Sequence, residues 1–250
     1  MIDSKIIKID KIYLPNVSRE TLNELEEYSK SILNKNKKIN LISSSTEKSI
    51  NTRHIYDSAQ SIDFIDKNDI KVCTDLGSGA GLPSIVLGIL MKSKKQGFRV
   101  IFYEKSYHKS NFLKEMSKKF NLEAKIYQKN IFEEKNLVTD VIICRAFKPL
   151  PVIFEIATNN FKNFKYIVIY LGKSGKKILK DVSIKWKFDI EEMKSLTNDE
   201  SSVVKISNLK KKNGKKNYFS HKSKRWSREN NNRDQSCCWI VYERKKNFNN

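Results

Sequence analysis

The feature that most constrains the fold is a glycine-rich turn, Asp75-Leu76-Gly77-Ser78-Gly79-Ala80-Gly81-Leu82-Pro83. The short β-branched segment before it predicts the end of a buried strand, and the apolar residues at helical spacing from Ser84 to Met91 predict a helix after it. Glycine permits positive φ and lets a ligand approach the main chain closely, and the start of a helix adds free N–H groups. The segment therefore predicts a strand, a ligand-binding turn and a helix in succession.

The spacing of the glycines distinguishes between classes of ligand. A dinucleotide-binding turn has the form G-x-G-x-x-G, and a phosphate-binding P-loop ends in G-K-[ST]. Here the third glycine comes one residue early, and an acid stands two residues before the first glycine. The form D-x-G-x-G-x-G resembles the first motif of class I S-adenosylmethionine-dependent methyltransferases. Taken alone, the turn is also compatible with a tight strand–helix connection that binds nothing.

A second acidic residue strengthens the case for a ligand. The predicted strand from Phe98 ends at Glu104, and ligands of open α/β sheets lie beyond the carboxyl ends of the strands. A carboxylate at such a strand end can accept both hydrogens of a ribose diol, although a solvated glutamate is also common there. Together, the turn and Glu104 favour a cofactor that contains adenosine.

Strands and helices alternate from residue 71 onward. This pattern predicts a mostly parallel, seven-stranded, Rossmann-like α/β sheet with right-handed crossovers. The predicted strands are 71–75, 98–104, 124–128, 138–145, 166–171, 184–192 and 202–207. The predicted helices are 82–93, 106–119 and 150–160, and a basic segment at 172–180 is left without an assigned structure.

An N-terminal helical cap is predicted over residues 1–66, followed by a catalytic domain at 67–209 and a basic, mostly disordered tail at 210–250. Within the cap, residues 18–35 and 46–62 are expected to form two helices. His54 and Asp57 would be neighbours on one face of the second helix, and a hydrogen-bonded structural pair is the favoured interpretation.

The charge balance favours a polyanionic partner. The chain has a net charge of +21, of which residues 207–250 carry +10 and residues 1–206 carry +11. Nucleic acid is the common partner of such a surface. We expect a cytoplasmic protein with no membrane span, because there is neither a signal peptide nor a run of about 18 apolar residues. The four cysteines lack metal-ligand spacing, so we expect reduced thiols and no metal site.

Several short motifs stand in the order of a known family. They are Asn40-Leu41, Arg53-His54-Ile55 with Asp57-Ser58, the glycine turn, Lys109 with Phe112-Leu113, Arg145-Ala146-Phe147, and Gly172-Lys173. Over roughly residues 18–207 the chain resembles the bacterial small-subunit ribosomal RNA guanine-N7 methyltransferases of the RsmG (GidB) type. The tail after about residue 210 has no counterpart in this resemblance.

The resemblance implies a function and a set of site residues. It implies transfer of a methyl group from S-adenosyl-L-methionine to N7 of a guanine in 16S rRNA, by a monomer that acts on free rRNA or on an assembling small subunit. Arg145 is the residue expected nearest both cofactor and target, and therefore the catalytic candidate. The cofactor-binding residues it implies are Asp75, Gly77, Gly79, Gly81, Leu82, Glu104, Ile131, Phe132 and Arg145. The substrate-binding residues it implies are Arg53, His54 and Lys173.

The chemistry agrees with the lack of an acid–base pair at the motif. Guanine N7 carries an in-plane lone pair and no proton, so its methylation needs alignment rather than a general base. Arg145 could instead be a strand-end arginine that pairs with a carboxylate. Three other functions stay open: a methyltransferase with a different RNA acceptor, a non-catalytic RNA-binding protein, and an NAD-dependent oxidoreductase. The glycine spacing disfavours the last, and the absence of N-P-P-Y or D-P-P-Y after the fourth strand disfavours amino-group acceptors.

Overall fold

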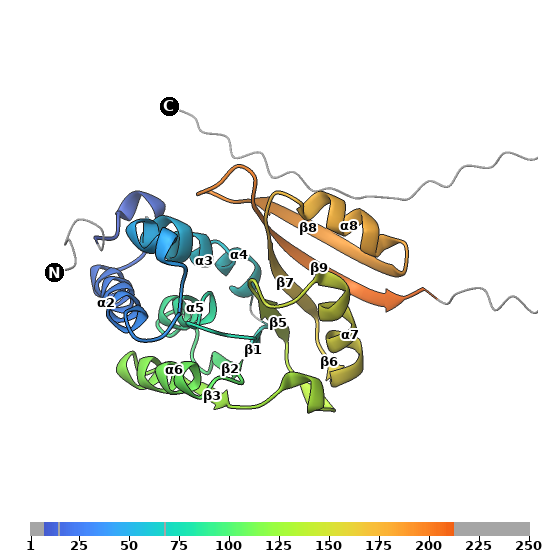
Figure 1. The fold of residues 1–250 in the computed structure, drawn as a ribbon, viewed down its shortest axis with the longest axis horizontal. Helices are drawn as coiled ribbons and strands as arrows, with labels where there is room; N and C mark the ends of the chain where they lie inside the picture. Colours follow the sequence, from blue (N-terminus) through green and yellow to red (C-terminus); the bar gives the residue numbers. More distant parts are fainter. Residues whose placement is uncertain (1–7, 15, 68, 213–250) are drawn as a thin grey trace, which may run out of the picture.

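The computed structural model describes residues 8–14, 16–67 and 69–212, and these residues build a seven-stranded sheet with the order β3-β2-β1-β5-β7-β9-β8 (Figure 1). β3, β2, β1, β5 and β7 are parallel, whereas β9 runs antiparallel to both β7 and β8. The predicted mostly parallel seven-stranded sheet is confirmed. The strands are β1 (Val72–Leu76), β2 (Arg99–Tyr103), β3 (Ala124–Tyr127), β5 (Val141–Cys144), β7 (Tyr166–Leu171), β8 (Trp186–Lys194) and β9 (Ser202–Lys211).

Helices cover both faces of the sheet (Figure 1). The connecting helices are α5 (Ser84–Met91), α6 (Tyr107–Lys119), α7 (Leu150–Asn160) and α8 (Gly175–Ser183). The last of these, α8, was not predicted, because the 172–180 segment was characterised by its basic composition alone. A small separate sheet pairs β4 (Leu137–Val138) with β6 (Phe161–Asn163).

The predicted strand at 138–145 is divided into β4 and β5. Between them the Asp140 carboxylate accepts hydrogen bonds from the main-chain N–H groups of Lys71 and Val72, at 2.8 and 2.9 Å. Asp140 therefore fixes the start of β1 beside β5 instead of continuing one long strand.

The N-terminal cap begins with a regular helix, α2 (Arg19–Asn36). Its N-cap is Ser18, whose hydroxyl accepts from the Thr21 N–H at 3.2 Å. The expected second helix is broken into four pieces: a 3-10 helix η2 (Ser44–Ser49), a π-helix η3 (Asn51–Tyr56), α3 (Asp57–Ala59) and α4 (Ile62–Ile65). Hydroxyl groups along this segment, including those of Thr46 and Thr52, bond to carbonyls three residues earlier and compete with regular helical bonding.

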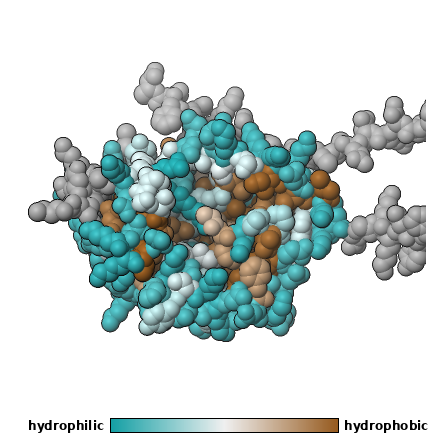
Figure 2. Space-filling model, in the orientation of Figure 1, coloured by the Kyte–Doolittle hydropathy of each residue, from teal (hydrophilic) through white to brown (hydrophobic). Residues whose placement is uncertain are grey.

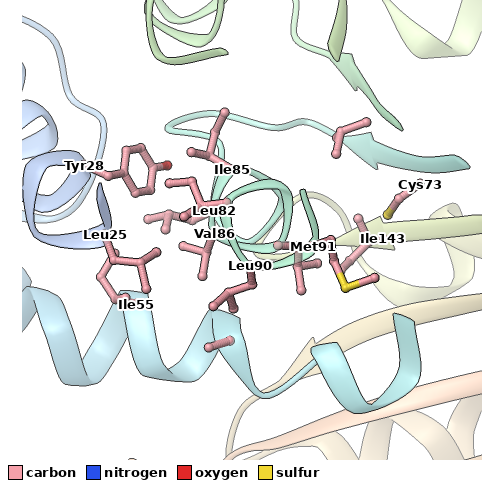
Figure 3. Close-up of a cluster of buried hydrophobic side chains, with 14 of the residues drawn as sticks. Leu25, Tyr28, Ile55, Cys73, Leu82, Ile85, Val86, Leu90, Met91 and Ile143 are labelled. Atoms are coloured by element: carbon pink, nitrogen blue, oxygen red, sulfur yellow. The ribbon is translucent and has the colours of Figure 1, made fainter. Parts of the chain in front are cut away.

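The cap and the sheet share one hydrophobic core. Leu25, Tyr28 and Ile55 of the cap pack around Ile85 and Val86 of α5 (Figure 3). A second buried cluster lies on the opposite face of the sheet, where α7 and α8 pack. Alternate residues of β5 enter the two clusters, as expected for a strand buried on both faces.

Hydrophilic residues surround the hydrophobic patches on the face seen in Figure 2. No helix among the described residues is long and apolar enough to cross a membrane. Cys73 and Cys144 are buried free thiols, and no cluster of potential metal ligands occurs within residues 8–14, 16–67 and 69–212. Cys237, Cys238 and the tail expected to be disordered lie outside the described residues.

Candidate active site

The glycine turn adopts the conformation that its sequence predicts. Gly77, Gly79 and Gly81 have φ values of +67°, +56° and +88°, in the left-handed region that favours glycine. The main-chain N–H groups of Gly77 and Ser78 donate to the Tyr103 carbonyl at 2.9 and 3.3 Å. The turn is therefore tied to the end of β2, next to the predicted acidic residue.

Glu104 touches the turn directly. Its Oε2 accepts from the Gly79 N–H at 2.9 Å, and its Oε1 accepts from the Ser106 N–H at 2.8 Å. A carboxylate has about four acceptor positions, so each oxygen keeps a lone pair for another donor. The structure thus brings together the two features that the sequence singled out.

Asp75 lies at the end of β1 and is buried. Its Oδ2 has no hydrogen-bond partner among the described residues. Burial, with a smaller contribution from the nearby charge of Glu104, raises the pKa of Asp75 to about 7, and the neighbouring Ser84 partly offsets this rise. The site therefore contains a buried carboxyl group of which one oxygen has no partner among the described residues.

The cap holds the other side of the turn. The Tyr28 hydroxyl of α2 donates to the Ala80 carbonyl at 2.7 Å, and burial raises the pKa of Tyr28 so that the hydroxyl stays protonated. A Cβ placed on Gly81 would lie 2.4 Å from Ile85 Cγ1 and 3.2 Å from the Tyr28 hydroxyl. Leu82 points into the shared core and is 8% exposed (Figure 3).

Arg145 follows β5 and binds the cap. Its Nη2 lies 2.8 Å from Asp57 Oδ2, its Nη1 donates to the Ser58 hydroxyl at 3.4 Å, and Nη2 also donates to the Arg53 carbonyl. The guanidinium lies 5.4 Å from the centre of the Tyr170 ring. The structure therefore contains the ion pair that was the alternative interpretation of Arg145, and a catalytic role for Arg145 stays a prediction.

His54 and Asp57 are not hydrogen-bonded to each other in the part of the chain that the structure describes. His54 Nε2 lies 2.8 Å from the Thr46 hydroxyl, whereas Asp57 binds Arg145 and also accepts from Ser195 at 3.1 Å. Burial, together with the charges of Arg145 and Arg53, lowers the pKa of His54 to about 4. His54 is therefore a neutral imidazole at pH 7. The predicted hydrogen-bonded pair is therefore wrong, because each of the two residues bonds to another partner.

Arg53 and His54 lie on the π-helix η3. Segments of π-helix occur often at functional sites, because they redirect the side chains around them. Arg53 is exposed while its carbonyl binds Arg145. This one segment therefore connects an exposed cation with the strand end of β5.

The loop after β3 and the segment after β7 contain the remaining predicted residues. Ile131 begins the 3-10 helix η4 (Ile131–Glu133) and is buried, and its carbonyl accepts from Asn160 at 2.7 Å. Phe132 is 45% exposed, with Lys148 Nζ 6.0 Å from its ring centre. Lys173 is exposed and pairs with Glu200 at 2.7 Å, and no ion pair or hydrogen bond within the described residues joins it to Arg53.

Sequence reasoning missed the position of Phe147. A Cβ on Gly77 would lie 2.1 Å from Cδ2 of the Phe147 ring, so the ring lies directly against this glycine. The motif Arg145-Ala146-Phe147 marks the segment, but nothing in its composition indicates the contact. A valine at Gly77 would therefore collide with Phe147 as well as with any ligand.

The family model and the similar sequences name one family. The family model described as rRNA small subunit methyltransferase G matches residues 21–212. A protein of Pelagibacter ubique named Ribosomal RNA small subunit methyltransferase G is 43% identical over 79% of this chain and 93% of its own length. Proteins with the same name from Bartonella tribocorum and Rickettsia felis are 32% and 34% identical, and the match covers 92% and 97% of their lengths. A solved SAM-dependent methyltransferase from Aquifex aeolicus aligns with a TM-score of 0.48 and 15% identity, over 63% of this chain and 92% of that one.

Proposed function

The chain belongs to the rRNA small subunit methyltransferase G family, and from this premise we propose that it transfers a methyl group from S-adenosylmethionine to N7 of a guanine in 16S ribosomal RNA. Family membership supports the reaction and the class of RNA. The choice of N7 is what the resemblance to the RsmG type implies, and the absence of an N-P-P-Y or D-P-P-Y motif after β5 is consistent with a ring-nitrogen acceptor. The observation that carries the proposal is the hydrogen bond between Glu104 and Gly79. It joins the acidic residue after β2 to a glycine turn whose spacing resembles the first motif of methyltransferases.

The residues present fit this cofactor, which offers a ribose diol and a cationic amine. Glu104 keeps one free lone pair on each oxygen for the diol after binding Gly79 and Ser106. The unpartnered Oδ2 of Asp75 would be compensated by a nearby cation. A Cβ on Gly79 would meet only the Gly77 carbonyl, at 3.8 Å, so a ligand can approach the main chain there. When bound, the cofactor supplies the electrophilic methyl group.

The work of the protein in this reaction is alignment and exclusion of water. Guanine N7 has no proton to lose, so no general base is needed. His54 is neutral and bonded to Thr46, and the Arg145 charge is balanced by Asp57. Both groups are held in place rather than poised for proton transfer, which agrees with an alkylation that moves a positive charge from sulfur to the purine.

Contacts with the RNA are assigned to Arg53, His54 and Lys173. Arg53 is exposed on η3, and Lys173 is 81% exposed in its side chain. Residues 1–206 carry a net charge of +11, which suits phosphate contacts. We further place the enzyme in the cytoplasm, as a monomer that acts on 16S rRNA or on an assembling small subunit.

The proposal is tested with purified protein, tritiated S-adenosylmethionine and total RNA from cells that lack the endogenous activity. We expect label in 16S rRNA alone, and N7-methylguanine at a single position after reduction and strand cleavage. The Glu104→Ala variant is the matched control and should lose the label. Methylation of another atom or another RNA would replace the proposed acceptor. Tight RNA binding without any methyl transfer would favour the non-catalytic alternative.

A further inference from the structure

The ring of Phe147 covers the first glycine of the cofactor turn. An added Cβ on Gly77 would lie 2.1, 2.7 and 2.8 Å from three carbons of this ring, far inside van der Waals contact. Gly77 is thus required for the ring as well as for its own φ of +67°. Phe147 therefore lies where the glycine turn of β1 meets the loop that follows β5.

The flanking residues fix the ring in this place. Ala146 has a φ of +51°, an uncommon conformation for a residue with a Cβ. On one side of it Arg145 is anchored to Asp57, and on the other side α7 begins with buried Leu150. A strained residue held between two anchors is typical of functional loops. The strain positions Phe147, whose side chain is half-buried at this edge.

We propose that Phe147 is the wall against which the acceptor guanine stacks during methyl transfer; this inference rests on the proposed function and assigns the positioning of its base. The N7 lone pair lies in the plane of the purine. The base must therefore present its edge to the methyl group and one of its faces to the protein. Aromatic side chains stack unpaired RNA bases in this manner and leave the base edges free.

The electronic character of the ring adds a second reason. Methyl transfer to N7 leaves the purine with a positive charge, and the face of an aromatic ring attracts cations. The neighbouring cation, Arg145, is neutralised by Asp57 and stacked on Tyr170, so its charge does not oppose the cationic product. Stacking on Phe147 thus strengthens as the reaction proceeds, which is the condition for lowering a barrier.

The test compares three substitutions of Phe147 in the full-length protein. Phe147→Leu keeps an apolar side chain on Gly77 and removes the aromatic face, whereas Phe147→Tyr and Phe147→Trp keep that face. The readouts are the single-turnover rate at saturating 16S rRNA and cofactor, the KM for RNA, and the affinity for S-adenosylhomocysteine by calorimetry. Phe164→Leu is the matched control, because Phe164 is also half-buried against the same cluster but precedes β7 at the opposite end of the sheet.

We expect Phe147→Leu to lower the single-turnover rate roughly 5- to 150-fold, the range that corresponds to loss of one base–aromatic stack. The tyrosine and tryptophan variants should stay within about threefold of wild type, in line with stacking strength. Affinity for S-adenosylhomocysteine should be unchanged in all three variants and in the control. An unchanged rate in Phe147→Leu would overturn the inference. So would a loss of cofactor affinity as large as the loss of rate, which would make Phe147 part of the cofactor pocket. Failure of the wild-type protein to methylate 16S rRNA would remove both the proposed function and this inference.

Discussion

Arg145 and Asp57 form an ion pair, with 2.8 Å between Nη2 and Oδ2, that joins the end of β5 to the start of α3. The two side chains are only 19% and 12% exposed. The other carboxylate oxygen of Asp57 accepts from Ser195 and Gln60, at 3.1 and 3.2 Å. The pair therefore connects the cap, the carboxyl end of β5 and the turn after β8.

Asp57→Asn should destabilise the protein by about 3 kcal/mol, because removing one partner of a buried pair leaves the other charge uncompensated. Urea unfolding measures the effect, and adding Arg145→Leu to an Asp57→Leu background should restore part of the lost stability. The control is Glu115→Ala, which removes a 3.5 Å pair between exposed side chains and should not change the midpoint. Equal effects of both variants would mean that the Arg145 pair is as weak as a surface pair.

Gly81→Ala should be far more destabilising than the same substitution at Gly97. Both glycines have positive φ, +88° and +77°, so both variants carry a backbone cost of about 1–2 kcal/mol. At Gly97 the new methyl group meets nothing within 4 Å, but at Gly81 it meets Ile85 at 2.4 Å and Leu113 at 2.9 Å. Overpacking adds about 1–3 kcal/mol. Guanidinium unfolding of the two variants side by side tests this, and similar midpoints would contradict the packing described for the turn.

Asp75 should make the protein less stable as pH rises from about 4 to 7. Its pKa is raised to about 7 in the folded protein, so its stabilising contribution is complete below the pKa of the unfolded chain and is lost as pH rises through 7. Asp75→Asn should therefore gain stability relative to wild type over this interval, by up to about 4 kcal/mol, since a tenfold change in proton affinity equals about 1.4 kcal/mol. Unfolding free energies at pH 4, 5.5, 7 and 8 give the slope.

His54 provides the control of opposite sign for that series. Its pKa is lowered to about 4, so its stabilising contribution is present above pH 6.5 and is lost as pH falls through 4. His54→Gln should remove the loss of stability at acidic pH. It should not change the dependence of the unfolding free energy on pH that is due to Asp75. A wild-type profile that neither variant alters would show that the two groups titrate normally.

Glu104→Ala should weaken binding of S-adenosylhomocysteine by about 2–4 kcal/mol, because it removes charge-assisted hydrogen bonds to the ribose and the brace on Gly79. Glu104→Gln keeps one acceptor oxygen and should lose about half as much. Calorimetric titration distinguishes them, with the exposed Glu123→Ala as control. If a 2′,3′-dideoxy analogue binds the wild type as well as the parent compound does, the ribose assignment is wrong.

Removal of the tail should depend sharply on where the chain is cut. β9 continues to Lys211, which pairs with Trp186, and the Lys212 N–H donates to the Lys185 carbonyl. A protein ending at Lys212 should keep its position specificity and most of its single-turnover rate. Its RNA affinity should depend less steeply on salt, because residues 213–250 carry a net charge of +7 and each phosphate contact adds about −0.7 to −0.9 to the slope.

The matched control ends at Ser207, within β9 (Ser202–Lys211). It removes the residues of β9 that pair with the start of β8 and should unfold or aggregate. Both edges of β9 are already paired, with β7 on one side and β8 on the other. If the protein that ends at Lys212 is soluble but has lost all methylation, the tail takes part in catalysis or in binding the substrate.

Local sequence patterns predicted the features of this fold that depend on interactions between residues close in the sequence. The bounds of α7 and β7 match their predicted ranges, and the glycines of the turn have the positive φ that their spacing implies. The missed helix α8 was detectable, because Ile178, Leu179 and Val182 recur at helical spacing among its lysines. The π-helix η3 was not detectable, because it results from competition between hydrogen bonds of side-chain hydroxyl groups and those of the main chain.

Contacts between distant segments were beyond reach of the sequence. The identification of Arg145 did not reveal Asp57 as its partner, and the motif that contains Phe147 did not reveal its position on Gly77. Such contacts depend on how the cap and the loop after β5 pack together. Only the resemblance to a family indicated that these residues share one site, and it did not specify their geometry.

The hydrogen bond from Tyr28 to Ala80 ties the glycine turn to a buried residue of α2. Local opening of the turn has to break this bond and disturb the buried packing of α2, so its amides should exchange with deuterium nearly as slowly as those of the helix. A ligand that rigidifies the turn should then slow exchange along α2 without touching it. The first helix of the chain would thus report, through its exchange rates, whether the cofactor is bound.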